Sequence, residues 1–290
     1  MCEPRQEFVT GDASRLPGGV RLIGYRSSGL PEGVHLGVPG ATLTFILSLD
    51  GPVRAADGEA ELRAGRSVGL DVLLAGLQDQ ATYVVRPSHE EGVQLAIDPL
   101  AARALFGVPA AEISASMASA FDPGRWGRDL WQHVGETPTW QGRFDVVSQA
   151  LAHRGHTRAD DCVGPRREVV GAWRLLTRSR GAIGIDDLAR EVSLSTRQLR
   201  QEFVREFGIG PKAAGRLMRF EHAMGRMTSA IRAGRTPSLA GVAADCGYAD
   251  QSHLSREFRG YLAMPPSLWC EQERRNIQVG GHAGREDWVS

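Results

Sequence analysis

The last third of the chain carries the same pattern of residues twice, and this repeat constrains the fold more than any other feature. The first copy runs from Ile185 to Phe203, and the second from Leu239 to Phe258. Each copy begins with a short segment whose apolar residues lie three or four positions apart, which is typical of one face of a helix. A polar turn and a second segment of the same kind follow. The pattern predicts two helix-turn-helix units.

The second helix of each unit has a defined start. Ser195 and Asp250 are residue types that cap a helix, because a side-chain oxygen accepts an otherwise unpaired backbone N–H of the first turn. Leu199 and Phe203 in the first copy, like Leu254 and Phe258 in the second, indicate an apolar inner face. We therefore expect both second helices to pack inward through that stripe and to expose the opposite face.

Polar residues that can hydrogen-bond base edges or phosphates occupy the outer faces of both second helices. With the two caps, the candidate DNA-binding residues are Ser195, Thr196, Arg197, Arg200, Gln201, Asp250, Gln251, Ser252, His253, Ser255 and Arg256. An ordinary pair of helical hairpins with solvated outer faces is the competing interpretation of a single such helix. Two similarly spaced turns, each followed by a cap and a polar helix containing Arg and Gln, favour DNA binding instead.

The residues from about Ile183 to Trp269 resemble the DNA-binding region of AraC/XylS-type regulators. The run Gly247-Tyr-Ala-Asp-Gln-Ser-His-Leu-Ser-Arg-Glu-Phe258 is very close to the signature of that family. Phe207 to Lys212 resembles the stretch where the first recognition helix ends and a long linker helix begins. The resemblance implies two recognition helices that enter successive major-groove segments on one face of the DNA.

Several residues depart from that family pattern. Ser193 and Ala263 stand where the family usually has Gly, and a residue other than Gly pays about 1 kcal/mol or more in a left-handed conformation. We therefore expect one or both turns to be built differently. Gly215 and Gly225 fall inside the expected linker helix, where each costs about 1 kcal/mol relative to Ala. They predict a helix that is either soft or tightly packed at those points.

Charge is divided unequally along the chain. Residues 166–275 hold 19 Arg or Lys against 12 Asp or Glu, whereas residues 1–165 hold 14 against 20. A basic half can approach phosphates and release counterions, while an acidic half is repelled by the duplex. This polarity agrees with DNA binding by the C-terminal half.

The first 160 residues have the pattern of a β-rich domain. Ala41 to Asp50 alternates apolar and polar residues, as in a half-buried strand. Further strands are expected at residues 19–26, 67–74, 81–86 and 92–97. Together they predict an antiparallel barrel or sandwich of cupin-like type. Helices are expected at residues 98–106, 129–134 and 139–153.

These patterns predict an α+β protein with four parts. They are a β-rich sensor or dimerisation domain with C-terminal helices (1–154), a linker (155–165), an all-α domain of two helix-turn-helix subdomains joined by a linker helix (166–275), and a flexible tail (276–290). The first part resembles, less closely, the sensor domains of the same regulators. In such proteins this domain binds a small molecule, dimerises, or does both.

Catalysis, cofactors and metals are not expected. A metal-binding cupin enzyme needs clustered His and carboxylate ligands, and His35 and His89 are isolated on different segments. No nucleophile elbow or phosphate-binding Gly loop is present. The four Cys show no CxxC spacing, so we expect free thiols. No apolar run of 18 residues occurs, and the first eight residues lack the apolar stretch of a signal peptide, so a cytoplasmic protein without membrane contact is expected.

The sequence therefore predicts a transcription regulator that binds double-stranded promoter or operator DNA, controlled through its N-terminal domain. A small-molecule effector, contact with RNA polymerase and a homodimer all stay open, as do activation and repression. The alternative is a DNA-binding accessory protein whose N-terminal half is a protein-interaction module without a small-molecule ligand.

Overall fold

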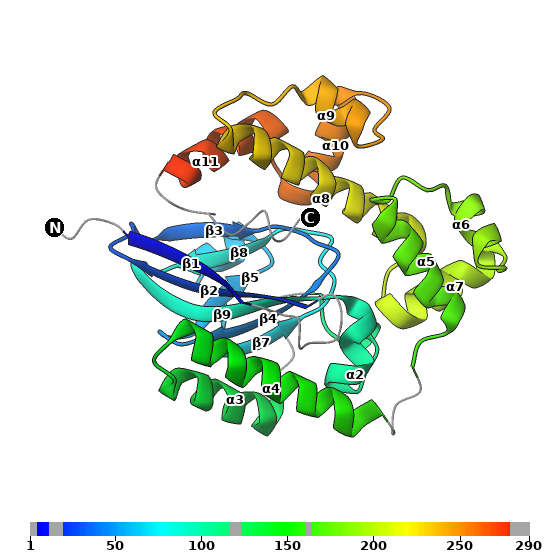
Figure 1. Cartoon of the computed structure of the whole chain (residues 1–290). Helices are drawn as coiled ribbons and strands as arrows, with labels where there is room; N and C mark the ends of the chain where they lie inside the picture. Colours follow the sequence, from blue (N-terminus) through cyan, green and yellow to red (C-terminus); the bar gives the residue numbers. More distant parts are fainter. Residues whose placement is uncertain (1–4, 12–19, 116–122, 160–163, 279–290) are drawn as a thin grey trace.

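The computed structural model describes residues 5–11, 20–115, 123–159 and 164–278. A β-rich N-terminal part is followed by an entirely helical C-terminal part (Figure 1). This confirms the fold class expected from the sequence. The flexible tail predicted at 276–290 lies outside the described residues, apart from the last turn of the final helix. None of the described helices is long and apolar enough to cross a membrane.

Two antiparallel sheets form the N-terminal part, and they face each other across an internal space (Figure 1). The five-stranded sheet contains, in spatial order, β1 (Arg5–Gly11), β2 (Val20–Ser28), β9 (His89–Ile97), β4 (Leu43–Ser48) and β7 (Val72–Ala75). The four-stranded sheet contains β3 (Gly33–Gly37), β8 (Thr82–Arg86), β5 (Val53–Ala56) and β6 (Val68–Leu70). A short helix, α1 (Glu59–Arg63), follows β5.

The predicted strands are present, and three strands were missed. The segment expected to form one strand at 67–74 forms two, because the chain passes at Asp71 from the four-stranded sheet into the five-stranded one. Strands β1, β3 and β5 had no prediction. Strands β1 and β3 are edge strands that bury little surface, and β5 has only four residues, so none shows a clear apolar alternation.

The apolar face of strand β4 is turned away from the second sheet. Phe45 packs against Phe106 and Trp126, with ring centroids 6.0 Å apart in both pairs. Trp131 donates a hydrogen bond to the backbone oxygen of Ser48. These partners belong to α2 (Ala102–Phe106) and α3 (Gly124–Glu136). Helices therefore cover the outer face of the five-stranded sheet, and the apolar residues of β4 serve that interface.

Helix α4 (Trp140–Ala159) packs beside α3 on the same sheet (Figure 1). It runs to Ala159, into the segment predicted as a linker at 155–165. The helix continues past Gly155 because it packs on α2, where Arg154 donates a hydrogen bond to the backbone oxygen of Leu105. Tertiary packing thus overrides the helix-weakening effect of Gly155. Two single 3₁₀ turns flank α2: η1 (Pro99–Ala101) precedes it and η2 (Ala110–Glu112) follows it.

Seven helices complete the described chain: α5 (Arg167–Arg178), α6 (Ile185–Glu191), α7 (Thr196–Phe207), α8 (Pro211–Arg232), α9 (Leu239–Asp245), α10 (Gln251–Leu262) and α11 (Pro266–Gln278). Helices α6–α7 and α9–α10 are the two predicted helix-turn-helix units. Helix α8 joins them (Figure 1). Each unit has an aromatic centre, formed by Trp173, Phe203 and Phe207 in the first and by Phe220, Phe258 and Tyr261 in the second.

Ser193 and Ala263 adopt the left-handed conformation despite their side chains. Their φ angles are 56° and 55°, close to the 73° of Gly247 in the second turn and the 77° of Gly208 at the end of α7. The expectation that these turns are built differently is therefore wrong. The chain keeps the glycine geometry and accepts the strain of a Cβ there.

Gly215 of α8 is tightly packed rather than soft. A Cβ on Gly181, which has a φ of 75°, would meet the backbone oxygen of Gly215 at 2.0 Å. A Cβ on Gly215 would itself approach both Gly181 and Leu176 at 3.4 Å. The two glycines thus permit the turn after α5 to lie directly on α8.

Replacing Ala263 with Gly is expected to stabilise the protein by about 1 kcal/mol, because it removes left-handed strain and only partly offsets this with backbone entropy. Thermal or urea unfolding measures the change. Ala233 is the matched control, since it is also an exposed helix-terminal Ala but has a φ of −76°. Ala233→Gly is expected to destabilise, and a gain from both variants would contradict the strain argument.

Candidate nucleic-acid interface

The first recognition helix, α7, begins as predicted. The Ser195 hydroxyl accepts a hydrogen bond from the Gln198 backbone N–H, and the Gln198 side chain accepts one from the Ser195 backbone N–H at 3.0 Å. This reciprocal pair satisfies two N–H groups that the helix leaves unpaired. The Thr196 hydroxyl, 3.4 Å from the Asp186 carboxylate, ties the helix to α6. The N-terminal turn of α7 is therefore fixed before any ligand arrives.

The second recognition helix, α10, is capped by Asp250, whose carboxylate accepts a hydrogen bond from the His253 backbone N–H at 2.7 Å. His253 is itself half-buried. Its ring packs edge-on against Tyr248, with centroids 5.2 Å apart, and its Nε2 lies 3.8 Å from the Glu257 carboxylate. These contacts hold His253 in the structure of the unit and leave it less accessible to a partner than the exposed candidates.

The remaining candidates lie at the surface, as the sequence pattern predicted for an outer face. Ser255 is half-buried, and the exposed candidates are Ser195, Thr196, Arg197, Arg200, Gln201, Asp250, Gln251, Ser252 and Arg256. Within the described ranges, the side chains of Arg197, Arg200 and Arg256 have neither a hydrogen bond nor an ion pair. Guanidinium groups in this state can bind phosphate or guanine without first breaking an internal contact.

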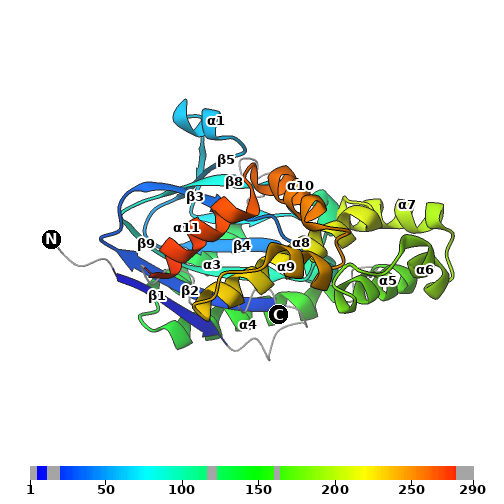
Figure 2. The same cartoon turned by 90° about the horizontal axis from the view of Figure 1, so that it is seen from above.

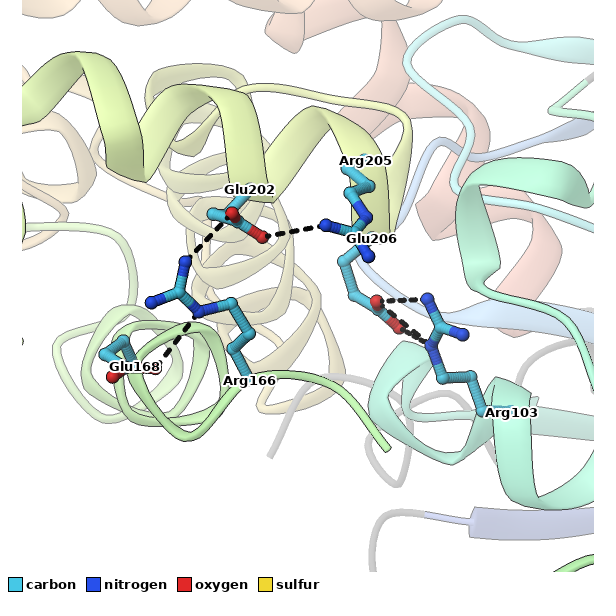
Figure 3. A network of polar contacts seen from close by, with 6 residues as sticks. All are labelled: Arg103, Arg166, Glu168, Glu202, Arg205 and Glu206. Carbon is cyan, nitrogen blue, oxygen red and sulfur yellow. Dashed lines mark hydrogen bonds and ion pairs between the residues drawn. The ribbon is translucent and has the colours of Figure 1, made fainter. Parts of the chain in front are cut away.

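Glutamates at equivalent positions of the two recognition helices form ion pairs with neighbouring segments of the chain. Glu202 of α7 binds Arg166 at 3.0 Å, and Arg166 also contacts Glu168 (Figure 3). Glu257 of α10 binds Arg216 of α8 at 2.7 Å, which raises the pKa of that guanidinium. Both pairs join a recognition helix to the helix or segment that precedes its unit. The two units therefore share equivalent ion pairs as well as the same apolar pattern.

The C-terminal end of α7 rests on the N-terminal domain. Arg103 of α2 forms a two-pronged ion pair with Glu206 of α7, with nitrogen–oxygen distances of 2.9 to 3.1 Å (Figure 3). Glu206 is buried. Gly208, directly after α7, packs against Ala111 of η2. Sequence reasoning did not identify this contact, because nothing local marks two residues 103 positions apart as partners.

Helix α10 touches the same domain through its own C-terminal end. The backbone oxygen of Tyr261 accepts a hydrogen bond from the backbone N–H of Ala81, just before β8. Both recognition helices are thus attached to the N-terminal domain by their C-terminal ends, whereas the first turns that carry the candidate residues are exposed. In helix-turn-helix proteins the N-terminal residues of the recognition helix contact base edges. The attachment therefore leaves the candidate DNA-binding residues of both first turns accessible.

Comparison with known proteins agrees with this geometry. Residues 188–272 match the family model described as a helix-turn-helix domain. No curated protein matches the chain. Among solved structures, wild-type ToxT from Vibrio cholerae strain SCE256 with bound unsaturated fatty acid has a TM-score of 0.51 and 11% identity, over 88% of this chain and 96% of that chain. An apo ToxT variant from the same strain also has a TM-score of 0.51, with 12% identity, over 88% of this chain and 98% of that chain.

The C-terminal part, with two capped recognition helices and the matching family model, defines a DNA-binding transcription regulator. Residues 188–272 form a helix-turn-helix domain of the AraC type, as the resemblance in the sequence indicated. The likeness to ToxT extends the shared fold to the N-terminal domain. At such low identity it concerns the fold alone.

Replacing Arg103 with Ala is expected to lower the free energy of unfolding by about 2 kcal/mol, because Glu206 then keeps a buried carboxylate without its two-pronged partner. Thermal unfolding of the full chain measures the loss. Arg125→Ala, which removes a fully exposed ion pair with Asp129, is the control and should change little. A double variant with Glu206→Ala should regain part of the stability, and equal losses in single and double variants would contradict this account.

Proposed function

We propose that the protein regulates transcription by placing α7 and α10 in two successive major-groove segments of one operator. The observation that carries the proposal is the pair of capped helices with exposed first turns and unpaired arginines, joined through one continuous helix, α8. A B-DNA major groove admits a helix, and one helical turn separates successive segments on the same face. Arg197, Arg200 and Arg256 supply the groups best suited to phosphate or guanine.

We further propose that the N-terminal domain controls this binding through a small-molecule effector. The sandwich encloses a cavity whose walls include α8 and α11, so an occupant of the cavity touches the DNA-binding domain directly. A solved structure of ToxT, which shares the fold, holds an unsaturated fatty acid. Because both recognition helices are attached to the N-terminal domain, a ligand that changes how the domains meet changes how these helices are presented.

Selection of bound duplexes from a random DNA library by the full chain tests the first proposal. We expect a site with two conserved blocks about one helical turn apart. A single block, or no enrichment over bulk DNA, would contradict the two-helix arrangement. Homodimer formation, measured by light scattering, would add a symmetric copy of the site.

Screening of metabolites by thermal shift tests the second proposal, since a ligand of the native state stabilises it. A stable dimer with no ligand response would favour the interaction module instead.

Replacing Arg256 with Ala is expected to weaken binding to the selected site by about 1 to 3 kcal/mol, which corresponds to roughly 5- to 150-fold in Kd, if the guanidinium contacts a base edge. Fluorescence anisotropy at fixed salt measures the change. Arg63→Ala removes an exposed arginine of the N-terminal domain and serves as the control. An unchanged Kd for the Arg256 variant would remove this residue from the contact surface.

The two half-sites are expected to contribute unequally. The first recognition helix exposes Arg197 and Arg200 in its first turns, and we expect it to supply more phosphate anchoring. We expect the second to supply more sequence discrimination through residues Gln251 to Arg256. Scrambling the half-site bound by α10 should therefore reduce affinity more than scrambling the half-site bound by α7. Equal losses in anisotropy titrations would contradict this division.

A further inference from the structure

The space between the two sheets is a cavity of about 730 Å³, and two helices of the DNA-binding domain form part of its wall. Helices α8 and α11 lie over the sandwich in both views (Figures 1 and 2). Such a volume suits one drug-sized molecule. The cavity exists because the apolar face of the five-stranded sheet is used by α2 and α3 on the outside. Its opposite face carries Thr44, Glu90 and Gln94 into the space between the sheets.

One face of α8 forms part of the wall. Glu221, Met224 and Thr228 line the cavity, and their spacing of three and four residues places them on one side of a helix. Trp269 and Gln272 line it from α11. An occupant therefore contacts the helix that joins the two helix-turn-helix units.

The Glu221 side chain is half-buried at the cavity wall, and a hydrogen bond fixes the position of its carboxyl. Its Oε1 accepts a hydrogen bond from the Ala41 backbone N–H at 2.8 Å. A Cβ on Gly40 would approach the same oxygen at 2.8 Å. Because glycine has no Cβ, the Glu221 carboxyl can lie this close to the loop before β4. Burial raises the pKa of Glu221 to about 7, although the Ala41 bond and the charge of Arg21 on β2 act in the opposite direction.

A second carboxyl of the cavity shows the same effect. Burial raises the pKa of Glu90 above its ordinary value, against a hydrogen bond from Ser27 and the charge of Arg86. Glu273 of α11 also lines the cavity and is buried. Apolar and aromatic side chains supply most of the remaining wall, with Phe8, Tyr25 and Trp269 as its rings. Carboxylates together with aromatic rings are the groups that bind an ammonium ion.

We propose that the cavity binds an organic amine with an apolar body, whose ammonium group pairs with the Glu221 carboxylate and whose body lies among the aromatic and aliphatic side chains. This proposal rests on the proposed role of the N-terminal domain as an effector domain and names the chemical class of the effector. Pairing with Glu221 places the charge of the ligand directly on α8. The cation also stabilises the charged form of a carboxyl that desolvation disfavours.

The charges of the wall disfavour a carboxylate ligand. Three carboxyl groups line the cavity against two guanidinium groups and the imidazole of His35. Of these, Arg86 acts on Glu90, and Arg275 has a side chain 71% exposed and lies 3.9 Å from the Glu271 carboxylate. A fatty acid, as bound in the ToxT structure, would bring a further negative charge beside Glu221. The ligand class inferred for this chain therefore differs from that of its structural relative.

Three probes that share one chain and differ in head group test the proposal: octylamine, octanoate and octan-1-ol. Isothermal titration of the full-length protein at pH 7.5 is expected to show octylamine binding at least about tenfold more tightly than octan-1-ol, and no binding of octanoate. Octanoate as the tightest ligand, with binding lost in Arg86→Gln, would overturn the proposal. So would a lack of binding by all three below their aggregation concentrations.

Glu221→Gln keeps an oxygen for the Ala41 N–H and removes the charge. It is expected to weaken octylamine by about tenfold or more and to leave octan-1-ol unchanged. Glu61→Gln, an exposed position outside the cavity, is the matched control. Glu90→Gln is the second variant, and it reports a smaller loss if Glu221→Gln does not fold. Retained octylamine affinity in both cavity variants would overturn the assignment.

Proton exchange gives a readout that a purely structural role of Glu221 would not change. Because burial raises the pKa of Glu221 to about 7, a fraction of these carboxyls carries a proton near neutral pH in the free protein, and pairing with an ammonium ion releases that proton. Affinity for octylamine should therefore rise between pH 6 and pH 8, and titrations in two buffers of different ionisation enthalpy should show the release. The charged or titratable side chains of Arg21, Tyr25, His35, Arg86, Glu90, Glu273 and Arg275 also face this region, so the Glu221→Gln variant is needed to assign the proton. Proton uptake, or release that persists in that variant, would contradict the pairing.

DNA binding by the same preparations separates this inference from the proposed function. Octylamine binding that depends on Glu221, in a protein that does not bind the selected operator, would refute the regulator and leave the ligand class standing. Operator binding that is normal, with octylamine binding absent, would refute the ligand class alone. Dependence of operator affinity on octylamine is the expected result when both hold.

Discussion

The position of helix α8 determines how the two helix-turn-helix units and the N-terminal domain lie relative to one another, because three different contacts fix this helix along its length. Near its start, Gly215 lies against the Gly181 turn of the first helix-turn-helix unit. One residue further, Arg216 binds Glu257 of the second unit. In its middle, Glu221 binds the backbone of Ala41 in the sandwich. A rigid helix that meets both units and the N-terminal domain cannot shift at one contact without affecting the others.

The domains meet in a way that separates attachment from recognition. The ends of α7 and α10 touch the N-terminal domain through the Arg103–Glu206 pair and the Ala81–Tyr261 hydrogen bond, while the first turns of both helices stay exposed. The candidate DNA-binding residues and the domain contacts therefore lie at opposite ends of the same two helices. A change at the domain interface can alter the relative position of the helices without covering the candidate DNA-binding residues. This division suits a regulator whose two binding segments have a fixed spacing on the duplex.

The sequence predicted most of the local structure because local interactions decide it. The caps at Ser195 and Asp250 and the inward stripe through Leu199 and Leu254 all arise from residues within one or two turns of each other. The strands missed by sequence reasoning, such as β3, depend on pairing with distant strands rather than on their own alternation. The helical segment after Gly155 was missed for the same reason, since packing against α2 holds it.

The sequence by itself determined that this chain has two helix-turn-helix units with capped, polar second helices, and where those helices begin. It also determined the charge division between the two halves. Only the tertiary structure decided which face of strand β4 meets helices and which meets the cavity, and it alone brought Arg103 to Glu206 and Ala41 to Glu221. Those partners lie 103 and 180 positions apart. Periodicity and capping act over a few residues, whereas a buried carboxyl finds its partner only when the whole chain has folded around it.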